Sequence, residues 1–236
     1  MPEIVEEMRA CANEGTIIDY ICLKKTNSLD YISYEAILLP EIIRAVGEIA
    51  EQGFDAVIIG CCLDPCINAL RESYKDIIIT GPFEAASSIA RSLGRKFSII
   101  ATRAKAQDQY LETIHRTGCE TAVSSIRYLN LKVMELQEDE GRLHRRMSEE
   151  IEAAIREDHA DVIVLACTME TGQYKKLQNA FGVPVIDPTV AALKHAEMMV
   201  AAKKLCGWSV SEKGSFETPP ENELQTFLDY QAKLVW

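Results

Sequence analysis

The feature that most constrains the fold of this chain is an internal repeat. Residues 55–64 read DAVIIGCCLD and residues 161–170 read DVIVLACTME. Each copy has an acidic residue, five apolar or small residues, a cysteine, and a second acidic residue three positions after the cysteine. The copies are 106 positions apart, and the same offset relates Pro82 to Pro188. One unit of roughly half the chain is used twice, which predicts two similar lobes.

The apolar runs of the repeat predict parallel strands. Residues 56–60 and 162–166 are too short for buried helices and are typical of strands covered on both faces. Amphipathic segments alternate with such runs along the chain, which indicates parallel sheets flanked by helices. The expected strands are 16–23, 56–60, 77–80, 97–102, 122–129, 162–166 and 183–186, and the expected helices are 2–13, 35–52, 64–73, 84–93, 104–117, 140–157, 170–180, 189–205 and 221–234.

The expected fold is therefore an α/β protein of two pseudo-symmetric lobes with a C-terminal helical tail. The first lobe comprises residues 1–94, joined by 190–236, the second comprises 95–189, and 207–236 form an extension. Moving the strand 97–102 back by 106 positions places its counterpart before Met1, so the first lobe is expected to lack its opening strand. The tail helix is expected to dock on one lobe through Leu224, Phe227, Leu228 and Leu234. Alternatively, residues 233–236 fill the vacant strand position.

Composition excludes several classes of function. The formal net charge is −11, and no basic stripe suits nucleic acid. No apolar run reaches the roughly 18 residues of a membrane span, and no leader peptide is recognisable. We expect a cytoplasmic homo-oligomer in which the eight cysteines are free thiols.

The repeated cysteines, Cys61 and Cys167, indicate the chemistry. Parallel strands present ligands at their carboxyl ends, where a following helix start would favour a thiolate. Two thiols on opposite sides of a cleft suit racemisation at a carbon next to a carbonyl, which needs a base on one face and an acid on the other. Helix-start donors could stabilise the enolate-like intermediate.

Several motifs together resemble a known family. They are Ile59-Gly60-Cys61 with Asp64-Pro65, Phe83-Glu84-Ala85-Ala86, Gly94 to Thr102, Val164-Leu165-Ala166-Cys167, and Val183 to Asp187 before Ala191-Ala192. Over about residues 15–205 the chain resembles the aspartate/glutamate racemase superfamily, and most closely its hydantoin and allantoin racemase branch. The sequence departs from that branch in lacking an Asn-Pro-Asn-Thr-type turn and in carrying Thr168-Met169-Glu170 after the second cysteine.

The resemblance implies roles for individual residues. Cys61 and Cys167 would be the two catalytic thiols, working without cofactor or metal on a hydantoin, an amino acid or a small carboxylate. Thr102, with donors around Cys62 and Thr168, would hold the carboxylate or ring carbonyl of the substrate. The remaining residues implied in substrate binding are Gly81, Pro82 and Glu84.

Other functions remain open at this point. Cis–trans isomerisation of a small diacid would use the same thiols, and a non-catalytic binding protein could retain them. A metal or redox site at Cys61, Cys62 and Cys66 is disfavoured, because the spacing is not C-x-x-C and no histidine is near. Nucleotide binding is disfavoured by the absence of G-x-G-x-x-G and G-K-[ST] motifs.

Overall fold

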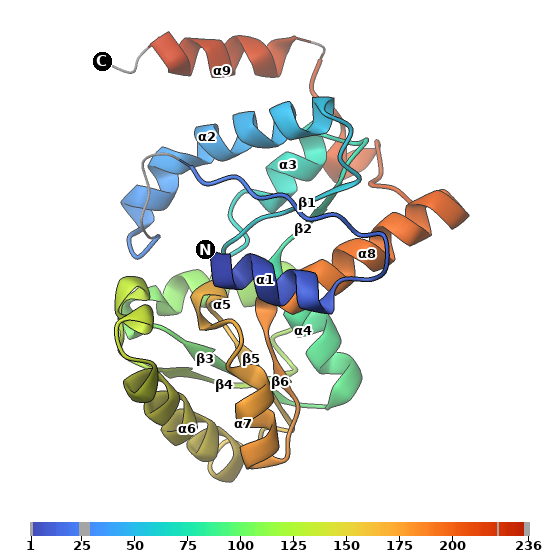
Figure 1. Ribbon diagram of the computed structural model, residues 1–236. Coiled ribbons are helices and arrows are strands. Elements are labelled where there is room, and N and C mark those ends of the chain that lie inside the picture. Colours follow the sequence, from blue (N-terminus) through green and yellow to red (C-terminus); the bar gives the residue numbers. More distant parts are fainter. Residues whose placement is uncertain (1, 24–28, 221, 234–236) are drawn as a thin grey trace.

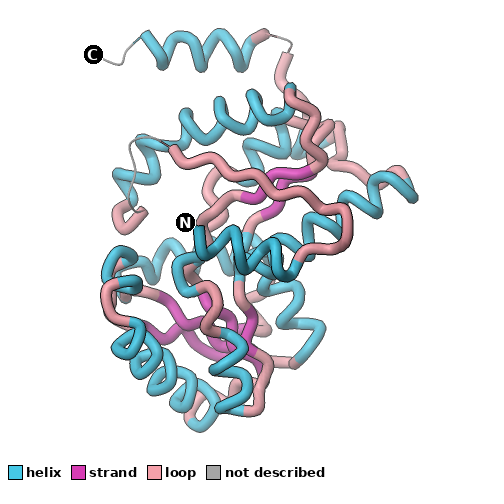
Figure 2. The backbone as a smooth tube through the Cα atoms, in the orientation of Figure 1, coloured by secondary structure: helices cyan, strands magenta, loops and turns pink. Residues whose placement is uncertain are grey.

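A computed structural model describes residues 2–23, 29–220 and 222–233. Figures 1 and 2 show two parallel sheets in separate lobes, with helices around each. The predicted α/β fold of two lobes with a helical tail is confirmed. None of the helices in the described ranges is long and apolar enough to cross a membrane.

The second lobe contains the larger sheet, of four strands. Its parallel strands lie in the order β4-β3-β5-β6, with bounds β3 Phe97–Ala101, β4 Val123–Tyr128, β5 Val162–Leu165 and β6 Val185–Ile186. Alternate residues of a strand point to opposite faces, so Ile99 packs beneath α4 (Pro82–Leu93) and α5 (Gln107–Thr117). Ile100 packs on the other face, against α6 (Glu140–Arg156) and α7 (Tyr174–Phe181). The central strands are thus buried on both sides, as their apolar sequences predict.

The first lobe contains a smaller sheet. Strands β1 (Ala56–Ile58) and β2 (Ile78–Thr80) are parallel, and they lie against α3 (Ile67–Ser73) and α8 (Pro188–Cys206). Helix α2 (Ile32–Glu51) contributes the rest of the core. Helix α1 (Pro2–Cys11) packs on α8, which therefore connects the N-terminal segment to both strands of this lobe. On the basis of these contacts we propose that residues 190–206 belong to the first lobe.

The predicted strand 16–23 is wrong. These residues form no strand, and the side chain of Ile17 is 86% exposed. The repeat supplies the reason. The counterpart of 16–23 in the second lobe is β4, which pairs with β3, and no strand in the described part of the first lobe corresponds to β3. The segment has no neighbouring strand to bond to, so among the described residues the first lobe has two strands fewer than the second, where one was expected.

Several helix starts also differ from the prediction, and α2 begins at Ile32 instead of residue 35. Helix α3 begins at Ile67 instead of residue 64, and the expected helix at 170–180 is divided into a 3₁₀ turn, η3 (Thr168–Glu170), and α7. Other short 3₁₀ turns that the sequence did not indicate are η1 (Ala104–Ala106), η2 (Val133–Gln137) and η4 (Gly214–Phe216).

The tail ends in helix α9 (Glu223–Lys233), which lies against α2, so docking of this helix on the first lobe is confirmed. The Arg44 guanidinium donates a hydrogen bond to the Leu228 carbonyl at 2.8 Å. Leu228 is buried as predicted, whereas Phe227 is 65% exposed. The expectations for Leu234 and for a strand at 233–236 fall on residues 234–236, outside the described ranges.

Candidate functional site

The two repeated cysteines follow the ends of β1 and β5, and the structure brings their turns together. The Thr168 hydroxyl, next to Cys167, donates to the Gly60 carbonyl, next to Cys61, at 3.2 Å. Cys61 is partly buried, whereas Cys62 is 4% and Cys167 is 9% exposed. The candidate site is therefore an enclosed group of thiols at the boundary between the lobes.

The expectation that helix starts favour thiolates here is wrong. Burial raises the pKa of the Cys61 thiol to about 12, and the carboxylates of Asp64 and Glu35 act in the same direction. Burial, and then the carboxylate of Glu170, raise the pKa of Cys167 well above its usual value. The helices begin too far along the chain to oppose this, since α3 starts at Ile67 and α7 at Tyr174. Both residues are thiols at neutral pH.

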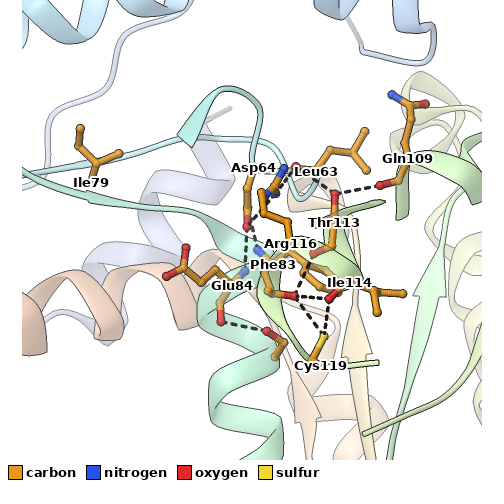
Figure 3. Close-up of polar contacts among 12 residues, drawn as sticks. Leu63, Asp64, Ile79, Phe83, Glu84, Gln109, Thr113, Ile114, Arg116 and Cys119 are labelled. Atoms are coloured by element: carbon orange, nitrogen blue, oxygen red, sulfur yellow. Dashed lines mark hydrogen bonds and ion pairs between the residues drawn. The ribbon is translucent and has the colours of Figure 1, made fainter. Parts of the chain in front are cut away.

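Asp64 has a role that the sequence did not indicate. It has a φ of +48°, and its fully buried carboxylate caps α4 instead of the helix that follows it in the chain. It accepts hydrogen bonds from the backbone N–H groups of Phe83 (3.0 Å) and Glu84 (2.8 Å), as Figure 3 shows. Gly81 makes room, since a Cβ there would lie 2.3 Å from Asp64 Cγ.

Helix α5 connects this turn to the second lobe. The Arg116 guanidinium lies 3.9 Å from the Asp64 carboxylate and donates to the Leu63 carbonyl at 2.9 Å. The Thr113 hydroxyl also donates to the Leu63 carbonyl, at 3.3 Å. The turn that follows Cys61 is therefore attached both to α4 and to the opposite lobe.

We expect Asp64 to make stability depend on pH. Burial raises its pKa to about 7, against the effect of the two N–H donors, whereas in an unfolded chain the pKa is about 4. Between those values the folded protein holds a proton that the unfolded chain has lost. The free energy of unfolding therefore falls as pH rises through this window, by up to about 1.4 kcal/mol per pH unit. Urea unfolding from pH 4 to 8 measures the slope.

Asp64→Asn is the matched variant, because it keeps the shape of the side chain and cannot titrate. Its stability should change less steeply with pH over the same window. Identical slopes for the two proteins would show that Asp64 does not titrate there.

The second copy of the repeat caps its equivalent helix, α8, differently. Asp187, the counterpart of Gly81, accepts from the N–H groups of Thr189 (2.9 Å) and Val190 (3.3 Å) at the start of α8. Its other oxygen accepts from the Thr171 hydroxyl at 2.9 Å. Glu170, the counterpart of Asp64, is fully buried, and neither of its carboxylate oxygens has a hydrogen-bond partner in the described structure. The offset of 106 aligns both pairs of residues, so the repeat itself carries the signal for this difference between the lobes.

The other residues implied in substrate binding are distributed over two places. Thr102 is 6% exposed and directly follows β3, at the same end of the sheet as Cys167. Gly81 and Pro82 form the start of α4, and the Glu84 carboxylate is ion-paired with Arg71 on α3 at 2.9 Å. Sequence reasoning missed Tyr110, whose buried hydroxyl donates to the Ala166 carbonyl at 2.8 Å, one residue before Cys167.

Two hollows lie away from the thiols. One of about 380 Å³ follows the outer edge of β4, and the other, of about 390 Å³, lies between α2 and α8. In the described ranges, no three His, Cys, Asp or Glu side chains gather as metal ligands.

Comparison with known proteins identifies the family. Residues 1–196 match the family described as Asp/Glu/Hydantoin racemase. The chain belongs to this family. A hydantoin racemase from Rhizobium meliloti is 35% identical over 185 residues, which cover 78% of this racemase-family chain and 75% of the relative.

Solved structures agree with the family assignment. Allantoin racemase from Klebsiella pneumoniae has a TM-score of 0.86 and 28% identity, covering 93% of this chain and 88% of the other. Allantoin racemase from Pseudomonas fluorescens gives the same score and identity, with 93% and 91% covered. These relationships make this member of the family an isomerase of the racemase class.

Proposed function

We propose that the protein is a cofactor-independent racemase or epimerase in which Cys61 and Cys167 move a proton at a carbon next to a carbonyl. The observation that carries the proposal is the position of the two cysteines. They occupy equal places in the repeat, follow strands β1 and β5, and lie in turns joined by the bond from Thr168 to Gly60. A two-fold arrangement of acids suits a reaction whose substrate and product are mirror images at one carbon.

The proposed reaction has two proton transfers. The thiolate of one cysteine removes the proton from one face of the substrate carbon, and the thiol of the other delivers a proton to the opposite face. The roles are exchanged for the other enantiomer. A raised thiol pKa suits this chemistry, because a thiolate formed in a buried site is a strong base. The thiol of the other cysteine stays protonated and can act as the acid.

We further propose a hydantoin-like substrate, on the basis of the hydantoin and allantoin racemases that the chain resembles. We propose that the Thr102 hydroxyl and the Cys62 thiol, which lie near the strand ends, donate to a ring carbonyl or a carboxylate. The Thr168 hydroxyl would do so in exchange for its bond to the Gly60 carbonyl. Gly81, Pro82 and Glu84 support the turn of Asp64 from the start of α4.

The setting of the reaction is also a proposal. Eight cysteines with no disulfide among the described residues suit the reducing cytoplasm. We expect a homo-oligomer, which size-exclusion chromatography with light scattering would test.

The function is tested by incubating the protein in D₂O with single enantiomers of 5-substituted hydantoins, allantoin, aspartate and glutamate. We expect loss of the NMR signal of the proton on the stereogenic carbon together with loss of optical rotation, for at least one hydantoin. Samples without protein correct for spontaneous exchange. A parallel incubation contains a small diacid with a carbon–carbon double bond. A change between its cis and trans forms, without racemisation of any other compound, would indicate the cis–trans isomerase. Binding of a compound without exchange of its proton would indicate a non-catalytic protein.

A further inference from the structure

Helix α1 is attached to the first lobe beside α8 (Figure 1). Ile4 and Met8 on its apolar face pack with Leu193 of α8. Just after the helix ends, the Asn13 N–H donates to the Glu197 carboxylate of α8 at 2.7 Å. Apolar and polar contacts therefore both hold α1 on this lobe.

One side chain of α1 nevertheless contacts the second lobe. The Glu7 carboxylate accepts hydrogen bonds from the Tyr174 hydroxyl at 3.0 Å and from the Lys175 ammonium at 2.9 Å. The bond from Lys175 lowers the pKa of the Glu7 carboxyl, so this group is ionised at neutral pH. Both partners lie in the first turn of α7, the helix that follows the turn of Cys167. We call the contacts of Glu7 with these two residues the α1 clasp.

The repeat contains the same kind of connection in the opposite direction. Glu7 and Thr113 are separated by the repeat offset, since 113 − 7 = 106, so α1 and α5 are equivalent helices. The Thr113 hydroxyl of α5 donates to the Leu63 carbonyl, in the turn that follows Cys61. One helix of each repeat thus contacts the segment that follows the cysteine of the other repeat.

The two connections differ in how exposed they are. On the α5 side, Arg116 donates to the Leu63 carbonyl and lies beside the fully buried Asp64 carboxylate. In the α1 clasp, 61% of the Lys175 side chain and 20% of the Glu7 side chain are exposed. Exposed ion pairs are weak and are screened by salt, so the α1 clasp should break first when the lobes separate.

The enclosure of the thiols means that the site has to open for a substrate. Cys62 is 4% exposed and Cys167 is 9% exposed. The bond from the Thr168 hydroxyl to the Gly60 carbonyl closes the space between the two cysteine turns. A small molecule can reach both repeated cysteines only when the lobes separate, and they must close again around it.

We propose that the α1 clasp is the contact that opens and closes the site, and that the α5 connection is the hinge. When Glu7 releases Tyr174 and Lys175, the turn of Cys167 moves away from the first lobe and substrate enters. When the clasp forms again, the thiols are enclosed and water is excluded while protons move. The catalytic meaning of this motion rests on the function proposed above.

The variant Glu7→Gln tests the clasp without any substrate. Glutamine keeps the shape of the side chain and an acceptor for the Tyr174 hydroxyl, but it loses the ion pair with Lys175. The protein is treated with methyl methanethiosulfonate, and mass spectrometry of the peptides gives the initial rate of modification at each cysteine. We expect Cys167 and Cys62 to react about threefold faster than in the parent protein, a factor typical of one exposed ion pair.

The chain offers matched controls. Glu6→Gln makes the same change of charge one position earlier on α1, at an exposed side chain, and should leave the rate at Cys167 unchanged. Cys206 is exposed and reports the reactivity of the reagent. Cys119 is 1% exposed in the core of the second lobe and reports general unfolding. Neither of these two rates should change in Glu7→Gln.

Three outcomes would overturn the proposal. The first is an unchanged rate at Cys167 in a folded Glu7→Gln protein. The second is an equal acceleration in Glu6→Gln. The third is an acceleration of Cys119 by the same factor as Cys167, because it would show that the whole protein unfolds more often.

Salt and exchanged charges distinguish the clasp from a purely structural role. Sodium chloride at about 1 M reduces the screening length to about 3 Å, so the rate at Cys167 in the parent protein should rise towards that of Glu7→Gln. The variant itself should respond little. Combining Glu7→Lys with Lys175→Glu should restore the parent rate at low salt. Equal responses of parent and variant to salt, without rescue by the exchanged charges, would mean that the ion pair does not close the site.

A second variant covers the case in which glutamine at position 7 is not tolerated. Lys175→Gln removes the same ion pair at an exposed position and should also accelerate Cys167. Rates are read before Cys11 is modified, because its sulfur lies 3.7 Å from the Glu7 carboxylate and its modification would disturb the clasp. Far-UV circular dichroism verifies that each variant is folded.

Racemase kinetics separate this inference from the proposed function. With a hydantoin that is racemised, Glu7→Gln should raise the rate constant of substrate association by up to about threefold. The rate at saturating substrate should stay the same, because the closed arrangement of the thiols is the same. A lower rate at saturating substrate with unchanged thiol modification would overturn the proposal. If no compound is racemised, the proposed function fails, while the modification rates still decide whether the clasp closes the site.

Discussion

Replacing Cys61 or Cys167 by serine is expected to lower the rate of racemisation by about a thousandfold. Each turnover needs a base on one face of the carbon and an acid on the other, and general acid–base groups typically contribute factors of about 10²–10⁴. The rate of change of optical rotation measures the loss. Cys206→Ser is the matched control, since Cys206 is exposed at the end of α8, and its activity should equal that of the parent protein.

Each single variant should still exchange a proton on one face of the substrate carbon. With one thiol left, the protein can remove a proton from one face and return deuterium to that face. Each variant should then exchange the proton of only one enantiomer, with opposite preferences for Cys61→Ser and Cys167→Ser. NMR of each pure enantiomer in D₂O shows this directly. Full activity in either variant would remove that cysteine from the acid–base pair, and exchange of the same enantiomer by both would show that the thiols do not face each other.

Loss of folding should not account for these effects. Serine is close to cysteine in size, and Cys61 is only partly buried. Cys167 belongs to a buried apolar cluster, so its serine variant should lose about 1–2 kcal/mol of unfolding free energy and remain folded. Thermal unfolding followed by circular dichroism provides the check.

Gly81→Ala is expected to destabilise the protein by about 3–5 kcal/mol, which is large for the addition of one methyl group. The new Cβ would lie 2.3–2.6 Å from the buried Asp64 carboxyl atoms. Asp64 would have to move and lose its bonds from Phe83 and Glu84, so overpacking adds to the cost of broken hydrogen bonds. Gly81 has a φ of −110°, which alanine adopts freely, so backbone strain contributes nothing.

Gly60→Ala is the control for that variant, because no atom lies within 4 Å of a Cβ built there. Its unfolding free energy should stay within about 0.5 kcal/mol of the parent value. Urea unfolding measures both variants. Equal stabilities would mean that the contact between Gly81 and Asp64 does not constrain the turn.

The repeat also provides a rescue. Combining Asp64→Ala with Gly81→Asp copies into the first lobe the cap that Asp187 forms in the second. The double variant should be more stable than either Asp64→Ala or Gly81→Ala alone, because α4 regains an acceptor for its first N–H groups. A double variant no more stable than Asp64→Ala would show that the two caps are not interchangeable.

The features that could be predicted from the sequence are those that depend on short local patterns of residues. Strands β1 and β5 and the cysteines that follow them could be placed from the repeat and from apolar runs of the right length. The two lobes followed from the repeat, and the parallel sheets followed from the alternation of strands and helices. These features are encoded in a few adjacent residues, so reading along the chain is sufficient to find them.

The errors concern features that depend on distant neighbours. Residues 16–23 have the composition of a strand, but a strand needs a partner at its edge, and composition does not say whether one is present. Asp64 precedes a helix in the chain, yet the N–H groups that it caps lie 19 and 20 positions later. The thiol pKa values depend on how completely the lobes enclose Cys61 and Cys167, which no local motif reports.

The small sheet of the first lobe has a consequence for how the molecule opens. Two paired strands of three residues are not stable by themselves, so β1 and β2 depend on the helices that pack on them. Native-state hydrogen exchange should therefore be faster at the amides of Ile59 and Ile78, which bond within this lobe, than at those of Ile163 and Ala166 in the second. Local unfolding would therefore begin in the first lobe, which carries Cys61. Such unfolding would expose the Cys61 thiol to solvent while the second lobe stays folded.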